Sequence, residues 1–328
     1  MTVIEAFDKF MKEKVNLDSE LVKKARKSRD NLLDNIQEFS GNNFFDLYKD
    51  INIQFGSFAR KTKCRELDDI DLMIGLMGAG ASYYSNDNWD NVKINANMSY
   101  EYQKECSNLD GTLNSIKVIE KFKTKLKDVR EYKKSEINRR SEAVVLNLIS
   151  KDWSFDIVPC FITVEESNGK NYYLIPNGGG NWKKTDPRKD KEKVTEVNQK
   201  FNGKVLELIR LAKKWNKENG HKISSYLLET MIINFCEKQG KLEGFVDLDF
   251  RNLLQYISNN IFFIVEDMKE IQENINTLSN DEKEIIKEKT LKHYEKATEA
   301  IEYERNKEYE KSIKKWKEIF GEDFPDYE

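Results

Sequence analysis

The chain has 328 residues, of which 38% are apolar and 34% charged, and its formal net charge is -3. This balance is typical of a folded, soluble protein and excludes a wholly disordered chain. The 55 basic and 58 acidic residues create no overall positive field, so strong nucleic-acid binding is not expected. No apolar run approaches the roughly 20 residues that cross a bilayer. We therefore expect no membrane association and a cytoplasmic location.

The cysteine and histidine content argues against a zinc site. The four cysteines are widely separated and form no CxxC pair. The two histidines, His221 and His293, have no metal-ligand spacing to the cysteines or to each other. Zinc chemistry is therefore not expected.

The N-terminal part of the chain combines helical and strand patterns. Residues 1–40 carry apolar side chains at spacings of three and four, which predicts one long scaffold helix or a pair of helices. Residues 51–55 alternate between apolar and polar and stop at Gly56, and residues 67–76 form a second candidate strand. The glycine-rich and then polar stretch over residues 75–97 predicts a loop.

Further helix and strand patterns follow. Residues 112–131 are typical of an amphipathic helix, with apolar residues on one side and lysines opposite. Strands are predicted over 143–149 and 155–164, and Pro159 in the second suits a sheet edge or a strand end because it lacks an N–H. Residues 177–181 predict a glycine-rich loop.

The C-terminal part shows only helical periodicity. The pattern covers residues 205–217, 225–236, 250–263 and two long charged segments that reach residue 320. The sequence therefore predicts an α+β protein with a mixed sheet and flanking helices over residues 1–190, including the N-terminal scaffold helix. A helical domain is predicted over residues 191–328.

Three aspartates form the most informative pattern in the chain. Residues i and i+2 of a strand point to one face, so Asp69 and Asp71 should project together while their apolar neighbours face the other side. Asp156 lies among apolar residues in a separate strand, and an adjacent strand can bring it beside the first pair. Carboxylates with phosphate oxygens are the ligands that Mg²⁺ prefers. We expect a site for two ions, Mg²⁺ or Mn²⁺, with Asp69, Asp71 and Asp156 as ligands and catalytic residues.

A Gly-Ser turn precedes the aspartates. Gly56 ends a strand, and Ser57 follows at the start of a short helix, where backbone N–H groups and a hydroxyl can approach a triphosphate closely. Alone, a Gly-Ser pair is a common turn and a D-x-D motif is usually a solvated face. Together with the later apolar-flanked Asp156, the two motifs predict a metal-dependent nucleotidyltransferase of the polymerase-β superfamily.

The segments around these residues resemble a known family. GSFARKTKCRELDDIDLMIGL, with SFDIVPCF, is similar to the bacterial cGAS/DncV-like nucleotidyltransferases, which make cyclic oligonucleotide second messengers in anti-phage defence. The resemblance covers roughly residues 50–235. It implies a polymerase-β-like core and a helical domain that completes the nucleotide pocket.

The same resemblance assigns roles in the helical part, where LIRLAKKWN and SSYLLE look like the family's nucleotide-binding segment. It implies that Lys213 contacts the nucleotide triphosphate, with Arg210 nearby, and that Ser225 contacts the same phosphates. On a helical wheel the cations Arg210, Lys213, Lys214 and Lys217 lie opposite the apolar side, a pattern that a solvated face also produces. Ser225 is also interpreted as a helix N-cap. Tyr226 is a candidate for stacking on a base, with core packing as the alternative.

The implied reaction is the joining and cyclisation of nucleoside triphosphates into a cyclic di- or trinucleotide with release of pyrophosphate. Two rival functions share these motifs: a template-independent polymerase or an adenylyltransferase acting on a protein or small molecule, and a catalytically silent binding module. The substrates would be ATP and GTP or pyrimidine triphosphates in a bacterial cytoplasm. No sensor element for nucleic acid is evident, so the sequence leaves three kinds of regulation open: a regulatory protein partner, a cellular metabolite, or control downstream. A downstream effector is expected to bind the cyclic product.

Overall fold

The computed structural model describes residues 1–39, 43–220 and 222–328. The last residue of the predicted N-terminal helix region and His221 therefore lie outside the described residues. The chain packs as two compact units. The sheet unit contains residues 19–60 and 67–189, and the helical unit contains residues 1–18, 61–66 and 190–328. The predicted division at residue 190 lies at this boundary, and two further segments, 1–18 and 61–66, pack with the helices.

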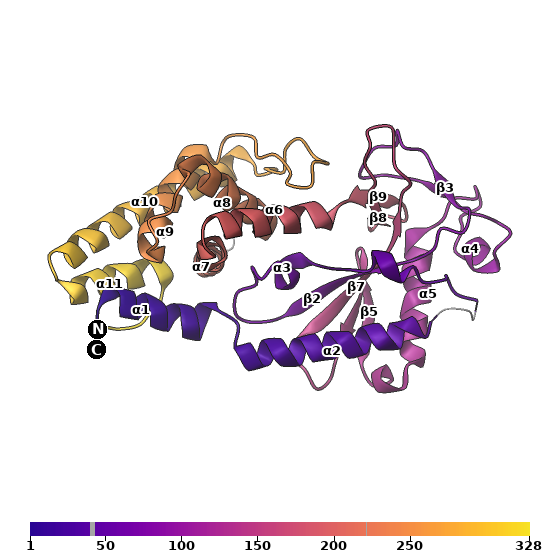
Figure 1. Ribbon diagram of the computed structural model, residues 1–328, viewed down its shortest axis with the longest axis horizontal. Helices are drawn as coiled ribbons and strands as arrows, with labels where there is room; N and C mark the ends of the chain where they lie inside the picture. Colours follow the sequence, from indigo (N-terminus) through magenta and orange to yellow (C-terminus); the bar gives the residue numbers. More distant parts are fainter. Residues whose placement is uncertain (40–42, 221) are drawn as a thin grey trace. The chain divides into compact units, whose positions relative to one another are not determined.

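One mixed sheet organises the sheet unit (Figure 1). Within the described residues it has seven strands, and β2 and β7 are its parallel pair while the other pairs are antiparallel. The main path runs through β1 (Ile53–Phe55), β2 (Asp69–Gly75), β7 (Ser154–Ile162), β6 (Ala143–Asn147) and β5 (Glu136–Arg140). β8 (Tyr173–Pro176) pairs with β7, and β9 (Trp182–Thr185) pairs with β8.

Helices and a small second sheet complete the sheet unit. The longer helices are α2 (Ser19–Gln37) and α5 (Ser115–Asp128), and α5 packs against β5, β6 and β7. The Asn114 side chain caps α5 by accepting hydrogen bonds from the first backbone N–H groups. The short elements are η2 (Lys49–Ile51), α3 (Gly56–Ala59), β3 (Ser82–Tyr83), β4 (Ile94–Asn95), α4 (Glu101–Glu105) and η3 (Arg130–Tyr132). The pair β3–β4 lies in the stretch that the sequence predicted as a loop.

The prediction that Pro159 marks a sheet edge or a strand end is wrong, because β7 is an interior strand and Pro159 lies within it. β6 pairs with β7 only up to Ile157, and β8 begins to pair at Phe161. The Cys160 carbonyl accepts a hydrogen bond from Leu76 beyond β2, so the neighbouring Pro159 directs its missing N–H toward the other side. That side is the gap between β6 and β8, where no ladder hydrogen bond is lost.

The helical unit contains α1 (Val3–Phe10), which continues into a π-helical turn, η1 (Met11–Val15). The predicted N-terminal helix region is therefore a pair of separate helices, α1 and α2. Five more helices lie entirely within the unit, and most of α6 does: α6 (Pro187–Lys200), α7 (Lys204–Glu218), α8 (Ser225–Gln239), α9 (Val246–Asn260), α10 (Asn280–Arg305) and α11 (Tyr309–Phe320). Among the described residues, none of the helices combines the length and the apolar character that a bilayer crossing requires.

The core of the helical unit is rich in aromatic side chains. Phe7 contacts Trp316 at a ring distance of 5.0 Å, and Phe250 contacts Phe320 at the same distance. These rings join α1 and α9 to the C-terminal helix α11. Because such pairs contribute about 0.5–1.5 kcal/mol beyond their buried area, they hold the first helix of the chain to the last.

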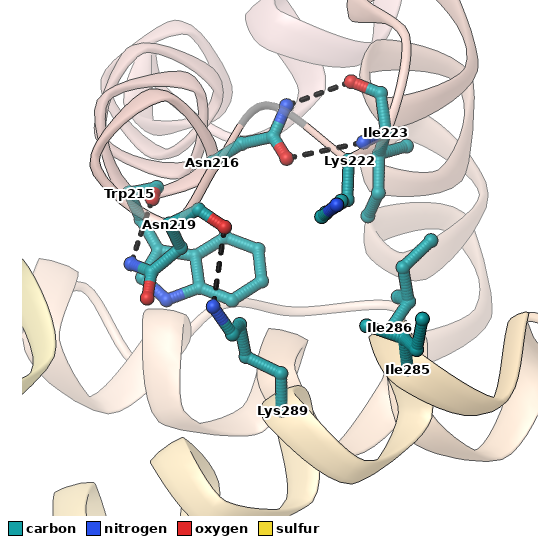
Figure 2. A pocket seen from close by; sticks show the side chains of 8 residues that line it. All are labelled: Trp215, Asn216, Asn219, Lys222, Ile223, Ile285, Ile286 and Lys289. Carbon is teal, nitrogen blue, oxygen red and sulfur yellow. Dashed lines mark hydrogen bonds between the residues drawn. The ribbon is translucent and has the colours of Figure 1, made fainter. Parts of the chain in front are cut away.

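The Asn216 side chain on α7 holds Ile223, which lies just before α8 (Figure 2). The Asn216 amide donates to the Ile223 carbonyl at 2.7 Å and accepts from the Ile223 N–H at 3.2 Å. Lys289 on α10 donates to the Asn219 carbonyl at 3.2 Å. The cavity that these residues line measures about 10 Å³, which suits at most one water molecule. We therefore regard it as a packing feature.

Candidate active site

The three predicted aspartates meet on one face of the sheet. The parallel register of β2 and β7 places Asp71 directly beside Asp156, and Asp69 lies two residues earlier on the same face. One carboxylate oxygen of each lies within 4.8 Å of the others, and all three residues are half-buried. Their neighbours Ile70 and Phe155 are buried on the opposite face. The strand alternation inferred from the sequence therefore brings the three carboxylates together.

The Gly-Ser turn lies directly against this cluster. β1 ends with Phe55 paired to Asp71, and Gly56 then begins α3 with φ +71°. A β-carbon built on Gly56 would lie 1.8 Å from Asp71 Oδ2, so a side chain larger than hydrogen cannot be accommodated. Ser57 is the second residue of α3 and is half-buried. The turn therefore brings backbone N–H groups and a hydroxyl to the edge of the carboxylate cluster.

The donor set fits a hard divalent cation. Within the described part of the chain, this is the one cluster of three or more ligand-type side chains, and all its donors are carboxylate oxygens. Mg²⁺ and Mn²⁺ prefer such oxygens, whereas zinc sites are usually built from thiolates and imidazoles. Burial raises the pKa of the Cys106 thiol to about 11, which keeps this cysteine protonated and unsuited to metal binding.

Lys213 in the helical unit is not part of a solvated basic face. Its side chain is 7% exposed and forms an ion pair with Glu229 of α8, which is completely buried. Lys214 is equally buried and pairs with Asp323 at 2.5 Å. The helical wheel placed both lysines on a polar side, but α8, α9 and α11 all pack on α7 and cover much of its surface.

The prediction that Ser225 is the N-cap of its helix is wrong by one residue. Ser224 is the N-cap of α8 and makes no side-chain capping hydrogen bond, while Ser225 is the first helical residue and is exposed. Both serines precede the apolar periodic run, so the pattern alone does not separate them.

Tyr226 is engaged at both its hydroxyl and its ring. The hydroxyl donates to Asp267 Oδ1 at 2.5 Å, and the Lys269 ammonium lies 4.2 Å from the ring centroid. Asp267 also accepts from the Lys269 backbone N–H at 3.0 Å. Tyr226 therefore links the start of α8 to the segment that follows α9.

Arg210 donates to two neutral oxygen acceptors. Its Nε donates to Asn16 Oδ1 at 2.7 Å, and its Nη1 donates to the Lys61 carbonyl at 2.9 Å. Burial lowers the pKa of the Arg210 guanidinium.

The predicted site residues belong to two different units. The aspartates and the Gly-Ser turn belong to the sheet unit, and the residues of α7 and α8 belong to the helical unit.

Sequence reasoning missed two partners of these residues. Glu229 is the only charged residue in the apolar stretch from Tyr226 to Cys236, and that isolated charge was a signal for a buried ion pair. Asn16 follows the N-terminal helix and carries no comparable signal, because its role depends on a contact with a residue far along the chain.

This mixed sheet, with its Gly-Ser turn, D-x-D strand and third aspartate on the adjacent parallel strand, defines a nucleotidyltransferase with the polymerase-β-like fold. Residues 90–198 match the model of the Second Messenger Oligonucleotide or Dinucleotide Synthetase domain. A probable cyclic nucleotide synthase of Bacillus cereus strain VD146 is 44% identical over 331 residues, covering 100% of this chain and 99% of that protein. A cyclic AMP-AMP-AMP synthase from an Acinetobacter strain is 28% identical, covering 63% and 60% of the two chains.

Two solved structures share the fold. Escherichia coli MS115-1 CdnC with ATP has a TM-score of 0.70 at 14% identity, and CdnC in complex with HORMA-deltaN has a TM-score of 0.69 at 15% identity. Each comparison covers 98% of both chains. The chain belongs to the cGAS/DncV-like nucleotidyltransferase family and is an enzyme of this kind.

Proposed function

We propose that the chain joins nucleoside triphosphates and closes the product into a cyclic di- or trinucleotide that serves as a second messenger in anti-phage defence. The main support for this proposal is that Asp69, Asp71 and Asp156 lie together beside the Gly56 turn. The similarity to cyclic nucleotide synthases of Bacillus and Acinetobacter supports cyclic rather than linear products.

In the proposed reaction an acceptor hydroxyl oxygen bonds to the α-phosphorus of the donor. The bond to the bridging oxygen of the β-phosphate breaks, pyrophosphate leaves, and the hydroxyl proton passes to solvent. Asp69, Asp71 and Asp156 would hold Mg²⁺ or Mn²⁺, two ions in all, which supply charge stabilisation for the phosphates and lower the pKa of the acceptor hydroxyl. Gly56 leaves room for the Asp71 carboxylate, and Ser57 offers its hydroxyl to a phosphate oxygen.

The roles of the helical-unit residues in nucleotide binding are also proposals. We assign the triphosphate to Lys213 and Ser225, with Arg210 nearby, and the base to Tyr226, on the family resemblance. The ion pair with Glu229 bears on the first assignment, because a buried lysine already paired offers less charge to a ligand. A variant series described in the Discussion separates the structural part of Lys213 from its binding part.

Product analysis tests the proposed reaction. Purified chain is incubated with labelled nucleoside triphosphates and Mg²⁺ or Mn²⁺, and the products are treated with phosphatase. Cyclic products survive, whereas linear products lose their 5′-phosphates and would identify a template-independent polymerase. Label retained on protein or on an added small molecule would identify an adenylyltransferase. Folded protein that yields no product with any base combination would favour the silent binding module.

We also propose that a protein partner controls the enzyme and that an effector protein binds its product. The support is the solved complex of CdnC with a HORMA protein, a structure that shares the fold of this chain. The test measures product formation by the purified chain with and without a purified HORMA-domain protein. A rate that does not change on addition of this partner would contradict the proposal.

A further inference from the structure

The segment 61–66 connects the two motifs of the carboxylate site but packs elsewhere. It follows α3, which carries Gly56 and Ser57, and it precedes β2, which carries Asp69 and Asp71. Although both neighbours belong to the sheet unit, residues 61–66 pack in the helical unit. The segment therefore joins the Gly-Ser turn to the D-x-D strand along the chain.

Hydrogen bonds to the end of η1 hold the segment. The Arg65 N–H donates to the Val15 carbonyl at 2.8 Å, and Arg65 Nε donates to the Asn16 carbonyl at 3.1 Å. Arg210 of α7 joins the end of η1 to segment 61–66, because it donates to the Asn16 side chain and to the Lys61 carbonyl. We call this set of contacts the junction. Three parts of the chain that are far apart in sequence thus meet at one guanidinium.

The chemistry of this junction depends on the shape of arginine. Its acceptors are an amide oxygen and a peptide carbonyl, both neutral, so the contacts fix direction rather than cancel charge. A planar guanidinium presents its donors in a rigid fork, whereas a lysine ammonium is a single point on a flexible stem. The fork lets Nε and Nη1 of Arg210 donate to both acceptors from one position.

We propose that Arg210 and Asn16 are positioning residues for nucleotidyl transfer, which act by holding segment 61–66 in one conformation. The Gly-Ser turn and the D-x-D strand are joined to each other through this segment of the chain. The proposal rests on the proposed function and gives Arg210 a different role from the phosphate contact that the family resemblance implies. Misplacement of reacting groups by about 1 Å can cost on the order of 100-fold in rate.

Two readouts test the proposal. In Arg210→Ala and in Asn16→Ala, we expect kcat to fall by roughly 10- to 100-fold, with a smaller change in the KM for nucleoside triphosphate. Backbone amides of residues 61–66 should exchange hydrogen at least about 10-fold faster than in the wild type. The double variant should be no worse than Arg210→Ala, because both changes break the same junction. Arg210→Lys should resemble Arg210→Ala, since it keeps the charge but loses the fork.

Lys217→Ala is the matched control, because Lys217 is an exposed cation on the same helix. It should leave both readouts unchanged. An Arg210→Ala variant with normal exchange over 61–66, or one in which only KM rises, would overturn the proposal, as would full activity in Arg210→Lys. Should Arg210→Ala fail to fold, Asn16→Ala alone carries the same test. Absence of product in the wild type would refute the proposed function, while the exchange readout would still show whether Arg210 and Asn16 hold segment 61–66 in one conformation.

Discussion

Gly56 and the Asp71 carboxylate share one small volume at the end of β1. A β-carbon on Gly56 would lie 1.8 Å from Asp71 Oδ2 and 2.5 Å from its Cγ, well inside any allowed contact. Gly56 also has φ +71°, a left-handed conformation that side chains disfavour. The glycine is therefore required both by backbone conformation and by its close approach to the carboxylate.

Gly56→Ala should reduce the rate of product formation by at least about 100-fold, because the new methyl group must displace Asp71. Gly169→Ala is the matched control, since Gly169 has φ +72° and nothing within 4 Å of an added β-carbon. That control should lose about 1–2 kcal/mol of stability and keep its activity. Steady-state product assays and denaturant unfolding check both variants. Full activity in Gly56→Ala would show that Asp71 can move without consequence.

Removal of the metal or of its ligands should stop the reaction without unfolding the protein. EDTA, Asp69→Asn and Asp156→Asn are each expected to reduce synthesis by at least about 100-fold. Mg²⁺ at 100 times its dissociation constant should stabilise the wild type by about 2.7 kcal/mol and should stabilise the variants less. Thermal unfolding with and without Mg²⁺ measures this difference. Equal Mg²⁺ stabilisation in all three proteins would place the ion elsewhere.

Variants of the Lys213–Glu229 ion pair can distinguish a structural role of Lys213 from a role in nucleotide binding. Either Lys213→Met or Glu229→Leu alone should destabilise the protein by about 3–5 kcal/mol, because the remaining partner is a buried charge that has lost this ion pair. The double variant should recover most of that loss. If Lys213 binds the triphosphate, the double variant will keep a raised KM for the nucleotide. A double variant with normal stability and a normal KM would assign Lys213 a purely structural role.

His293 should make the fold sensitive to mild acid. The Trp215 indole N–H donates to His293 Nδ1 at 2.8 Å, which requires that nitrogen to be unprotonated, and burial lowers the pKa of His293 to about 4. The unfolded chain takes up this proton near pH 6.5, so it binds more protons than the folded protein between pH 6.5 and 4. Stability contributed by neutral His293 is therefore present above pH 6.5 and is lost as the pH falls toward 4.

The expected loss is roughly 3 kcal/mol across that interval. Denaturant unfolding of the wild type and of His293→Phe at several pH values measures it. The variant should be less stable at neutral pH, by about 1–3 kcal/mol, because the Trp215 N–H loses its partner. Its stability should depend less steeply on pH than that of the wild type. Parallel pH profiles would contradict the assigned role of His293.

The carboxylate cluster could be predicted from the sequence because its signals are local. Asp69, Asp71 and Asp156 each alternate with apolar residues, and alternation determines the face of the sheet on which a side chain lies. The helices of the C-terminal part were equally clear from their apolar spacing. The strand β5 (Glu136–Arg140) was missed because it is an edge strand, and four of its five residues are polar or charged.

Other features depend on tertiary contacts that no local pattern contains. The sequence predicted Pro159 at a sheet edge, but it lies within β7, beside the gap between the ends of β6 and β8. The helical wheel placed Lys213 on a polar face, but in the structure it forms a buried ion pair with Glu229. The hydrogen bonds of Arg210 to residues 16 and 61 likewise follow from no local pattern, because their acceptors are far away in the sequence.

The pairing of β2 with β7 limits where this chain can gain or lose residues. Asp71 and Asp156 are register partners, and the long connection between them includes loops, α4 and α5. Insertions in exposed loops of that connection leave the partnership intact, since loop length costs little free energy. A single residue inserted within β7 before Asp156 would turn this carboxylate to the opposite, buried face. Relatives of this enzyme can therefore differ widely in loop length but must keep the residue count constant within these two strands.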